Sequence, residues 1–327
     1  MGRQSHTRHL DLWMNGQHVG VWSRYAVRET LTYAKEWFDA PEGRPLSLSL
    51  PFQPGNLHHQ GDAVRNYFSN LLPDSQPILQ RLALRFKTGS TDAFDLLGEI
   101  GRDCVGALQI VPQGQDPGDP FAIEGVRLNE TGVAAEIAAA IGPGGRVGRG
   151  DESRDFRISI AGAQEKTALL KMGRYWMRPT GATPTTHILK LPLGLVGNQR
   201  LDLRDSVENE WLCAQILAAY GLPVANCVIR EFGGTKALVV ERFDRRWTSE
   251  KTALLRLPQE DMCQAMGVSP LLKYEADGGP GIAQILKVLE SSEARQRDRE
   301  NFFRAQVLFW MLCAPDGHAK NFSIALQ

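Results

Sequence analysis

The pattern of apolar residues changes once along the chain, and this change restricts the fold more than any other feature. Short apolar runs of strand length recur at 156–160, 167–171, 175–178, 187–191 and 237–243. One helix interrupts them: Asp205 or Ser206 can cap its start and Gly221 ends it. After Leu257 the spacing predicts helices, at 259–266, 281–291 and 297–313. A strand-rich unit with one helix, followed by a helical unit, predicts an α+β fold.

A further unit is predicted ahead of this region. The turn signal Asn15-Gly16 separates two short strands at 10–14 and 19–22, which predicts a hairpin. A helix is predicted over 62–72, and another helix with a strand over 92–111. Stretches rich in Gly and Pro at 112–120 and 142–150 mark boundaries. We therefore expect units at 1–118, 119–150 (a linker with a connecting helix), 151–247 and 248–327.

Composition narrows the function classes. Lys+Arg and Asp+Glu both number 37, so no overall charge draws the chain to nucleic acid or to an anionic membrane. The five cysteines include no C-x-x-C pair, and the polar N-terminus lacks the apolar segment of a secretory signal. These features predict a reduced, cytoplasmic protein.

The loop from Asp316 to Asn321 (DGHAKN) is the sharpest chemical motif, because it directly follows a predicted buried helix with Phe303, Val307 and Trp310 on one face. Phosphoryl transfer needs a carboxylate that deprotonates the attacking hydroxyl and an oxygen ligand for Mg²⁺. Asp316 and Asn321 suit these two roles. An ordinary Asp-Gly turn is the alternative that the motif alone leaves open.

Two further segments carry cations near strands. Lys190 lies in an apolar strand, where a buried lysine needs a partner such as a nucleotide phosphate, although an edge-strand lysine can instead reach solvent. The small-residue turn at 159–166 can bring backbone amides and Lys166 close to anionic oxygens, or it can be a plain hairpin turn.

The end of the strand 237–243 adjoins the helical unit, where the backbone of Glu241, Arg242 and Phe243 can contact an adenine edge. A core strand followed by a solvated charge run is the alternative. Either Glu208 or Glu210, near the start of the helix, can pair with Lys190.

Several strings in the same order resemble those of HipA-family kinase toxins. They are RPLSLSLP (44–51), NLLPDS (70–75), DLLGEIGRDCVGAL (95–108), DFRISIAGAQEKTALL (155–170), PTTHILKLP (184–192), ALVVERFDRRW (237–247), LLRLPQEDMCQ (254–264), DGGPGIA (277–283) and DGHAKNFS (316–323). The resemblance covers nearly the whole chain. It implies a protein-kinase-like two-lobed fold behind a family-specific N-terminal subdomain.

The resemblance also implies roles for individual residues and molecules. Asp316 is implied as the catalytic aspartate, Asn321 as a Mg²⁺ ligand and Ser159 as an autophosphorylation site. The implied ATP-binding residues are Lys190, Lys166, Ala161, Gly162, Ala163, Gln164, Glu241, Arg242, Phe243 and His318. The implied partners are a HipB-like helix-turn-helix antitoxin, through which DNA is contacted, and a protein substrate such as an aminoacyl-tRNA synthetase. Growth inhibition and persistence are the implied outcome.

The sequence departs from this family at its end. Family members continue into a segment with a second metal-binding aspartate, whereas no acidic residue follows Asn321 before Gln327. We therefore expect a C-terminally truncated kinase with weak or absent phosphoryl transfer on its own. A catalytically inactive module that binds an antitoxin or a nucleotide is the alternative, and a metal hydrolase built on Asp316 and His318 lacks an H-x-x-x-H or H-E-x-x-H pair.

Overall fold

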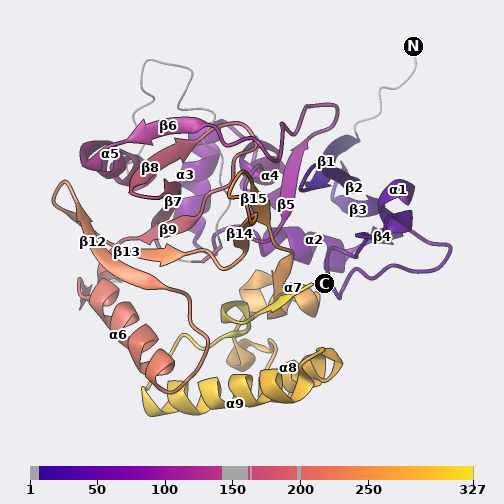
Figure 1. Cartoon of the computed structure of the whole chain (residues 1–327). Helices are drawn as coiled ribbons and strands as arrows, with labels where there is room; N and C mark the ends of the chain where they lie inside the picture. Colours follow the sequence, from indigo (N-terminus) through magenta and orange to yellow (C-terminus); the bar gives the residue numbers. More distant parts are fainter. Residues whose placement is uncertain (1–6, 142–160, 163, 197–199, 327) are drawn as a thin grey trace.

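The computed structural model describes residues 7–141, 161–162, 164–196 and 200–326. An antiparallel five-stranded sheet, in the order β4-β3-β2-β1-β5, forms the N-terminal unit (Figure 1). Its strands are β1 (Arg8–Met14), β2 (Gln17–Tyr25), β3 (Arg28–Tyr33), β4 (His58–Gln60) and β5 (Leu108–Pro112). The expected hairpin is confirmed: β1 and β2 pair, and Asn15 and Gly16 both have positive φ angles in the turn.

Four helices accompany this sheet, and its core is aromatic. They are α1 (Lys35–Asp39), α2 (Asp62–Ser69), α3 (Gln76–Phe86) and α4 (Ala93–Ile100). Trp22 of β2 is fully buried, with its ring stacked on Phe68 of α2 at 3.7 Å between centroids and edge-on to Phe94 of α4 at 4.7 Å. The helix expected over 62–72 is thus confirmed as α2. Helix α3 was not predicted from the sequence, and it buries only Ile78 and Leu79.

The second unit is an antiparallel six-stranded sheet in the order β12-β13-β9-β7-β8-β6. Its strands are β6 (Gly125–Leu128), β7 (Lys166–Met172), β8 (Tyr175–Pro179), β9 (His187–Lys190), β12 (Cys227–Phe232) and β13 (Thr235–Glu241). A short ribbon of β10 (Gly194–Val196) and β11 (Leu201–Leu203) precedes α6 (Ser206–Ala219), the expected helix. Four of the expected strands are present, and the one at 156–160 lies outside the described residues.

Residues within the expected linker form part of this sheet unit. β6 pairs with β8 at the sheet edge, and α5 (Glu130–Ile141) packs Val133 and Ile137 into the core beside Leu169 and Leu189. The 119–150 segment therefore supplies an edge strand and a covering helix.

The remaining residues form a predominantly helical unit, whose helices α8 and α9 lie at the bottom of Figure 1. Its helices are α7 (Met262–Ala265), α8 (Ile282–Val288) and α9 (Arg295–Met311), with 3₁₀ turns at Pro270–Leu272, Glu275–Asp277, Leu289–Ser291 and Ala319–Asn321. Two small ribbons join it, β14 (Arg245–Trp247) with β15 (Leu254–Arg256), and β16 (Gln259–Asp261) with β17 (Ser323–Ala325).

Two expectations for this unit were wrong. Residues 259–261 form strand β16 rather than the start of a helix, because they pair with β17 more than sixty residues later, a contact that local spacing does not reveal. On α9 the face with Phe303, Val307 and Trp310 is exposed, and Phe302 and Leu308 are buried instead. The helix carries apolar residues on more than one side, so its pattern did not define which side is covered.

A buried ionic network joins the N-terminal unit to the others. Asp103 accepts a hydrogen bond from Arg245 at 2.8 Å and lies 3.3 Å from Arg242 and 3.4 Å from Arg256. Asp244 accepts from Arg242 at 2.8 Å and from the amide of Gly106 at 2.8 Å. Within the part of the chain that the structure describes, no helix is long and apolar enough to cross a membrane.

Candidate nucleotide and phosphoryl-transfer site

Two lysines lie side by side on neighbouring strands. Lys166 at the start of β7 is opposite Lys190 at the end of β9 in the antiparallel register, so both side chains leave the same face of the sheet. The ammonium group of Lys190 pairs with Glu210 of α6, at 2.5 Å between Nζ and Oε1. Glu208 pairs with Lys236 instead. Of the two candidate carboxylates, the structure therefore assigns Glu210 to Lys190.

The turn before β7 is shaped around Lys166. Its ammonium donates to the carbonyl oxygen of Ala161 at 2.7 Å. Gly162 has a φ of +107°, a conformation that L side chains rarely adopt, so glycine is favoured there, and the Lys166 ammonium occupies the space that a Cβ would fill. The side chain of Gln164 donates to the Leu191 carbonyl at 2.5 Å and ties the turn to the end of β9. Ser159 and Ala163 lie outside the described residues.

Burial and the charge of Lys190 lower the pKa of Lys166 to about 8. The carboxylates of Asp74 and Glu210 oppose this change, and the ammonium of Lys320 adds to it. With a pKa of about 8, the Lys166 ammonium is still mostly protonated at neutral pH. In a buried site beside another cation, it is well suited to bind an anionic oxygen.

The loop after α9 holds the expected acid. The side chain of Asp316 is largely exposed, and Tyr274 donates its hydroxyl proton to Oδ1 at 2.8 Å. Nε2 of the buried His318 lies 3.4 Å from the same oxygen, and its ring meets Tyr274 edge-on. The side-chain amide nitrogen of Asn321, Nδ2, donates to the backbone carbonyl of Asp316. Asp316 is thus oriented from several sides while its carboxylate stays accessible.

The electrostatics of this loop follow from the same contacts. Burial raises the pKa of Tyr274 to about 12, and its bond to Asp316 adds to the effect. Burial also lowers the pKa of His318. Near neutral pH, Tyr274 is therefore a protonated donor and His318 is predominantly uncharged.

Asp74, which follows α2 in the N-terminal unit, connects the turn with the loop. Its backbone amide donates to the Gly162 carbonyl at 3.4 Å. Its carboxylate pairs with Lys273 at 2.9 Å and with Lys320 of the DGHAKN loop at 3.2 Å. The turn and the loop, which are more than 150 residues apart in the sequence, are therefore bound to one side chain.

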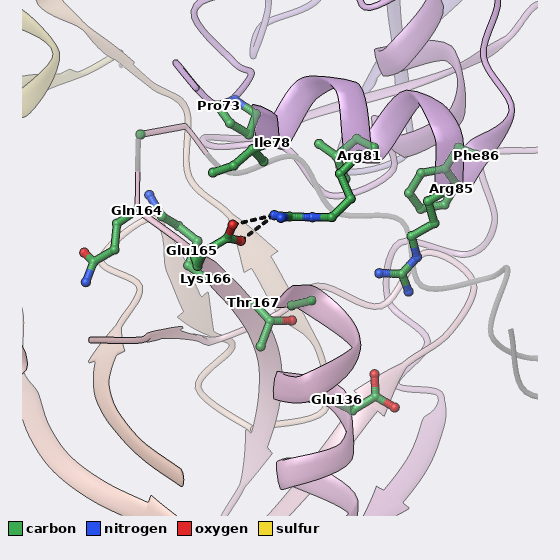
Figure 2. A pocket seen from close by; sticks show the side chains of 13 residues that line it. Pro73, Ile78, Arg81, Arg85, Phe86, Glu136, Gln164, Glu165, Lys166 and Thr167 are labelled. Atoms are coloured by element: carbon green, nitrogen blue, oxygen red, sulfur yellow. Dashed lines mark hydrogen bonds and ion pairs between the residues drawn. The ribbon is translucent and has the colours of Figure 1, made fainter. Parts of the chain in front are cut away.

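A pocket lies where α3 and α5 meet the turn, and Figure 2 shows its lining. Arg81 of α3 points across it and donates to both oxygens of Glu165, at 2.6 and 2.5 Å. Lys166 and Gly162 line the same pocket. The N-terminal unit thus contacts the turn a second time.

The segment expected to contact adenine occupies the junction of the sheet and the helical unit. The amide of Glu241 donates to the Asn226 carbonyl at 2.8 Å. The amide of Arg242 is bonded to Thr186, and its guanidinium is buried in the ionic network, so this side chain faces the interior. Phe243 is 63% exposed and is free to pack on a ligand.

Asn321 is the residue with an oxygen suited to Mg²⁺. Its Nδ2 is used in the bond to Asp316, which leaves Oδ1 for a cation. Among the described residues, no group of three or more His, Cys, Asp or Glu side chains forms a ready-made metal site. The donor set fits an ion that keeps waters and is held mainly by phosphates, as Mg²⁺ commonly is.

Sequence reasoning missed several residues that build this site. Asp74, Lys320, Lys273, Tyr274 and Arg81 were given no role of their own. Asp74 and Lys320 do lie inside the strings NLLPDS and DGHAKNFS. That two such strings can meet through an ion pair becomes visible only in three dimensions.

Comparison with known proteins gives two family models. One described as the HipA-like C-terminal domain matches residues 158–327, and one described as the HipA N-terminal domain matches residues 10–111.

Among curated relatives, a Sinorhizobium fredii protein named as a kinase, Y4mE, is 32% identical over 324 residues, which are 97% of this chain and 73% of the relative. The serine/threonine-protein kinase toxin HipA of Shewanella oneidensis is 30% identical over 278 residues, 83% of this chain and 58% of the relative.

Among solved structures, the Shewanella oneidensis complex of HipA, HipB and operator DNA matches with a TM-score of 0.75 and 26% identity, over 97% of this chain and 72% of that one. The α+β architecture described above is accordingly a protein-kinase-like fold. The chain belongs to the HipA family of kinase-like proteins.

Proposed function

We propose that the chain binds Mg²⁺-ATP between the Lys166–Lys190 pair and the DGHAKN loop and acts as a serine/threonine protein kinase. The observation that carries this proposal is the bridge through Asp74, because it joins the lysine-bearing turn to the loop with the exposed acid. The influence of the Lys320 charge on the pKa of Lys166 supports the same proximity.

Each residue has a chemical task in this proposal. Lys190, oriented by Glu210, and Lys166 neutralise phosphate oxygens. Asp316 accepts the proton of the attacking serine or threonine hydroxyl, and Tyr274 keeps the carboxylate in one orientation. The Oδ1 atom of Asn321 is one ligand of Mg²⁺, which when bound neutralises charge on the transferred phosphoryl group.

Autophosphorylation at Ser159 is a separate part of the proposal. Ser159 is the first residue of the small-residue turn at 159–166, so a phosphate there would compete with nucleotide phosphates for Lys166 and the turn amides. Phosphorylated protein should therefore bind ATP more weakly than unmodified protein. Equal affinities of the two forms, measured by titration, would remove this idea.

The partners follow from the family. We propose that a HipB-like helix-turn-helix protein binds the chain and contributes the DNA affinity, and that the substrate is a protein such as an aminoacyl-tRNA synthetase whose modification slows growth. The Shewanella relative, solved with HipB and operator DNA, supports the first of these. The balanced charge of the chain agrees with DNA contact through a partner.

The test is phosphate transfer from labelled ATP to a panel of purified aminoacyl-tRNA synthetases. We expect Asp316→Ala to lower the transfer rate by about 10²- to 10⁴-fold, the usual contribution of a general base, while ATP still binds. Phosphate transfer at the wild-type rate in Asp316→Ala would contradict the assignment.

A catalytically inactive binding module is the second candidate, favoured because the described part of the chain holds no group of three or more His, Cys, Asp or Glu side chains arranged for a metal. Absence of transfer in the wild-type chain, together with copurification of a small helix-turn-helix protein, would select it.

A further inference from the structure

Asp74 lies between α2 and α3, outside both lobes of the kinase-like fold, and yet it contacts both sides of the candidate site. Its side chain is 9% exposed. One carboxylate oxygen pairs with Lys273 at 2.9 Å and the other with Lys320 at 3.2 Å, while its amide donates to the Gly162 carbonyl at 3.4 Å. One residue of the N-terminal unit thus fixes segments of the other two units.

Lys320 is held almost entirely by residues outside its own loop. Its ammonium donates to the carbonyl and to the side-chain oxygen of Asn70, at 2.9 and 3.0 Å, and it lies 3.2 Å from Asp74 and 3.7 Å from Asp261. With both of its hydrogen bonds going to Asn70 and the carboxylates of Asp74 and Asp261 beside it, Lys320 is engaged as an anchor and not as a phosphate ligand. The residue that it anchors is its neighbour Asn321.

The second cation acts on the same loop through the backbone. Lys273 pairs with Asp74, and its carbonyl accepts a hydrogen bond from the amide of Ala319 at 3.1 Å. Tyr274, the next residue, donates to Asp316. Asp74 therefore reaches Asn321 through Lys320, and it reaches Asp316 through Lys273 and Tyr274.

We propose that Asp74 is a positioning residue of the phosphoryl-transfer site, which acts through Lys320 and Lys273 to hold the DGHAKN loop against the turn at Gly162. This inference rests on the proposed kinase function for its catalytic consequence, but its structural part does not. It makes the N-terminal unit a component of the active site. Although burial opposes ionisation, Lys320 and Lys273 keep the pKa of Asp74 below its usual value, so the carboxylate is charged at neutral pH.

Asp74→Asn gives a specific signature because it keeps the shape and removes the charge. The loop loses its anchor, so the turnover rate should fall by about tenfold or more, the effect of a misplaced catalytic group. The KM for ATP should not rise, since the substitution removes a negative charge near the phosphates and frees two cations. General disruption of the fold would instead raise KM.

The experiment combines this kinetic split with hydrogen exchange measured by mass spectrometry on the whole chain. Asp74→Asn should speed exchange in peptides covering 316–322 and leave peptides of β1 and β2 unchanged. Asp74→Glu, which keeps the charge, should stay close to wild type. Asp95→Asn is the matched control, because Asp95 is equally buried in the N-terminal unit and binds two arginines, Arg8 and Arg24.

The outcomes separate the two hypotheses. Exchange that accelerates in 316–322 while the wild-type chain shows no kinase activity would keep the positioning role and reject the proposed function. Unchanged exchange in Asp74→Asn, or an equal loss of turnover in Asp95→Asn, would overturn the positioning role even if the chain is an active kinase.

Discussion

Two ionic clusters connect the N-terminal unit to the rest of the molecule, and they are built from different cations. The first joins Arg242, Arg245 and Arg256 to Asp103 and Asp244, and all five residues are less than 10% exposed. Its guanidinium groups also donate to backbone carbonyls, for example from Arg242 and Arg245 to Cys104, both at 2.9 Å. The planar guanidinium groups present their donors in a fixed geometry, and the whole cluster is buried, so it is suited to hold the units together permanently.

The second cluster uses lysines. Lys166, Lys190, Lys273 and Lys320 surround the carboxylates of Asp74, Asp261 and Glu210. Lys190 and its partner Glu210 keep 26% and 39% of their side chains exposed. An ammonium group can exchange its partner for a phosphate oxygen at little steric cost, so this cluster can hold the fold and still receive a ligand. The comparison teaches that the same three units are joined once by buried, rigid donors and once by donors that can exchange their partners.

Removing the central acid of the arginine cluster should have the largest effect. Asp103→Ala leaves three buried guanidinium groups with only Asp244, and breaking a buried ion pair in this way costs about 3–5 kcal/mol. The measurement is the free energy of unfolding from denaturant titration. Asp39, which forms an exposed ion pair with Lys35, serves as the control, since Asp39→Ala should change the free energy of unfolding little. A loss below about 1 kcal/mol for Asp103→Ala would contradict the structural role.

Removing a lysine from the second cluster should weaken the binding of ATP. Lys190→Ala should weaken ATP binding by about 1.5–3 kcal/mol, or roughly 10- to 100-fold, with a small change in the unfolding free energy. Lys236→Ala is matched, because Lys236 lies in the same sheet and also pairs with a glutamate of α6. Equilibrium titration with ATP compares them, and equal losses would contradict the distinction.

Glu260 sharpens the comparison because it is a fully buried carboxyl that forms no ion pair with any of the residues that the structure describes. Burial raises its pKa to about 7, while its Oε1 accepts from the amide of Leu48 at 2.9 Å. Because the folded pKa lies above the unfolded value of 4.5, stability is full below pH 4.5 and falls as pH rises to 7. Glu260→Gln should thus stabilise by about 3 kcal/mol at pH 8 and by almost nothing at pH 4. Equal effects at both pH values in denaturant unfolding would exclude this origin.

The smallest effect is expected from the two glutamates of α6. Glu210→Gln should weaken ATP binding by about three- to tenfold, because Lys190 loses its orienting partner. Glu208→Gln should leave ATP binding unchanged, since its partner Lys236 is outside the site. The same ATP titration measures both, and the reverse order would show that the pairing is assigned wrongly.

The sequence was sufficient for features that depend on neighbours along the chain. The Asn15-Gly16 hairpin, α2, α6 and four strands of the large sheet follow from local spacing and turn residues. It was insufficient where distant segments decide. Strand β16 exists because of β17, the covered side of α9 depends on what packs there, and Asp74 gains its contacts only when three units meet.

The roles of individual site residues remain predictions, and their central premise is that the two lysines line one nucleotide site. An ATP analogue with an acyl phosphate at its terminal phosphate acylates lysines near that group, and peptide mapping identifies them. We predict label on Lys190 or Lys166 that excess ATP suppresses. Label confined to lysines elsewhere on the sheet, such as Lys171 or Lys236, or label that ATP does not suppress, would contradict the account.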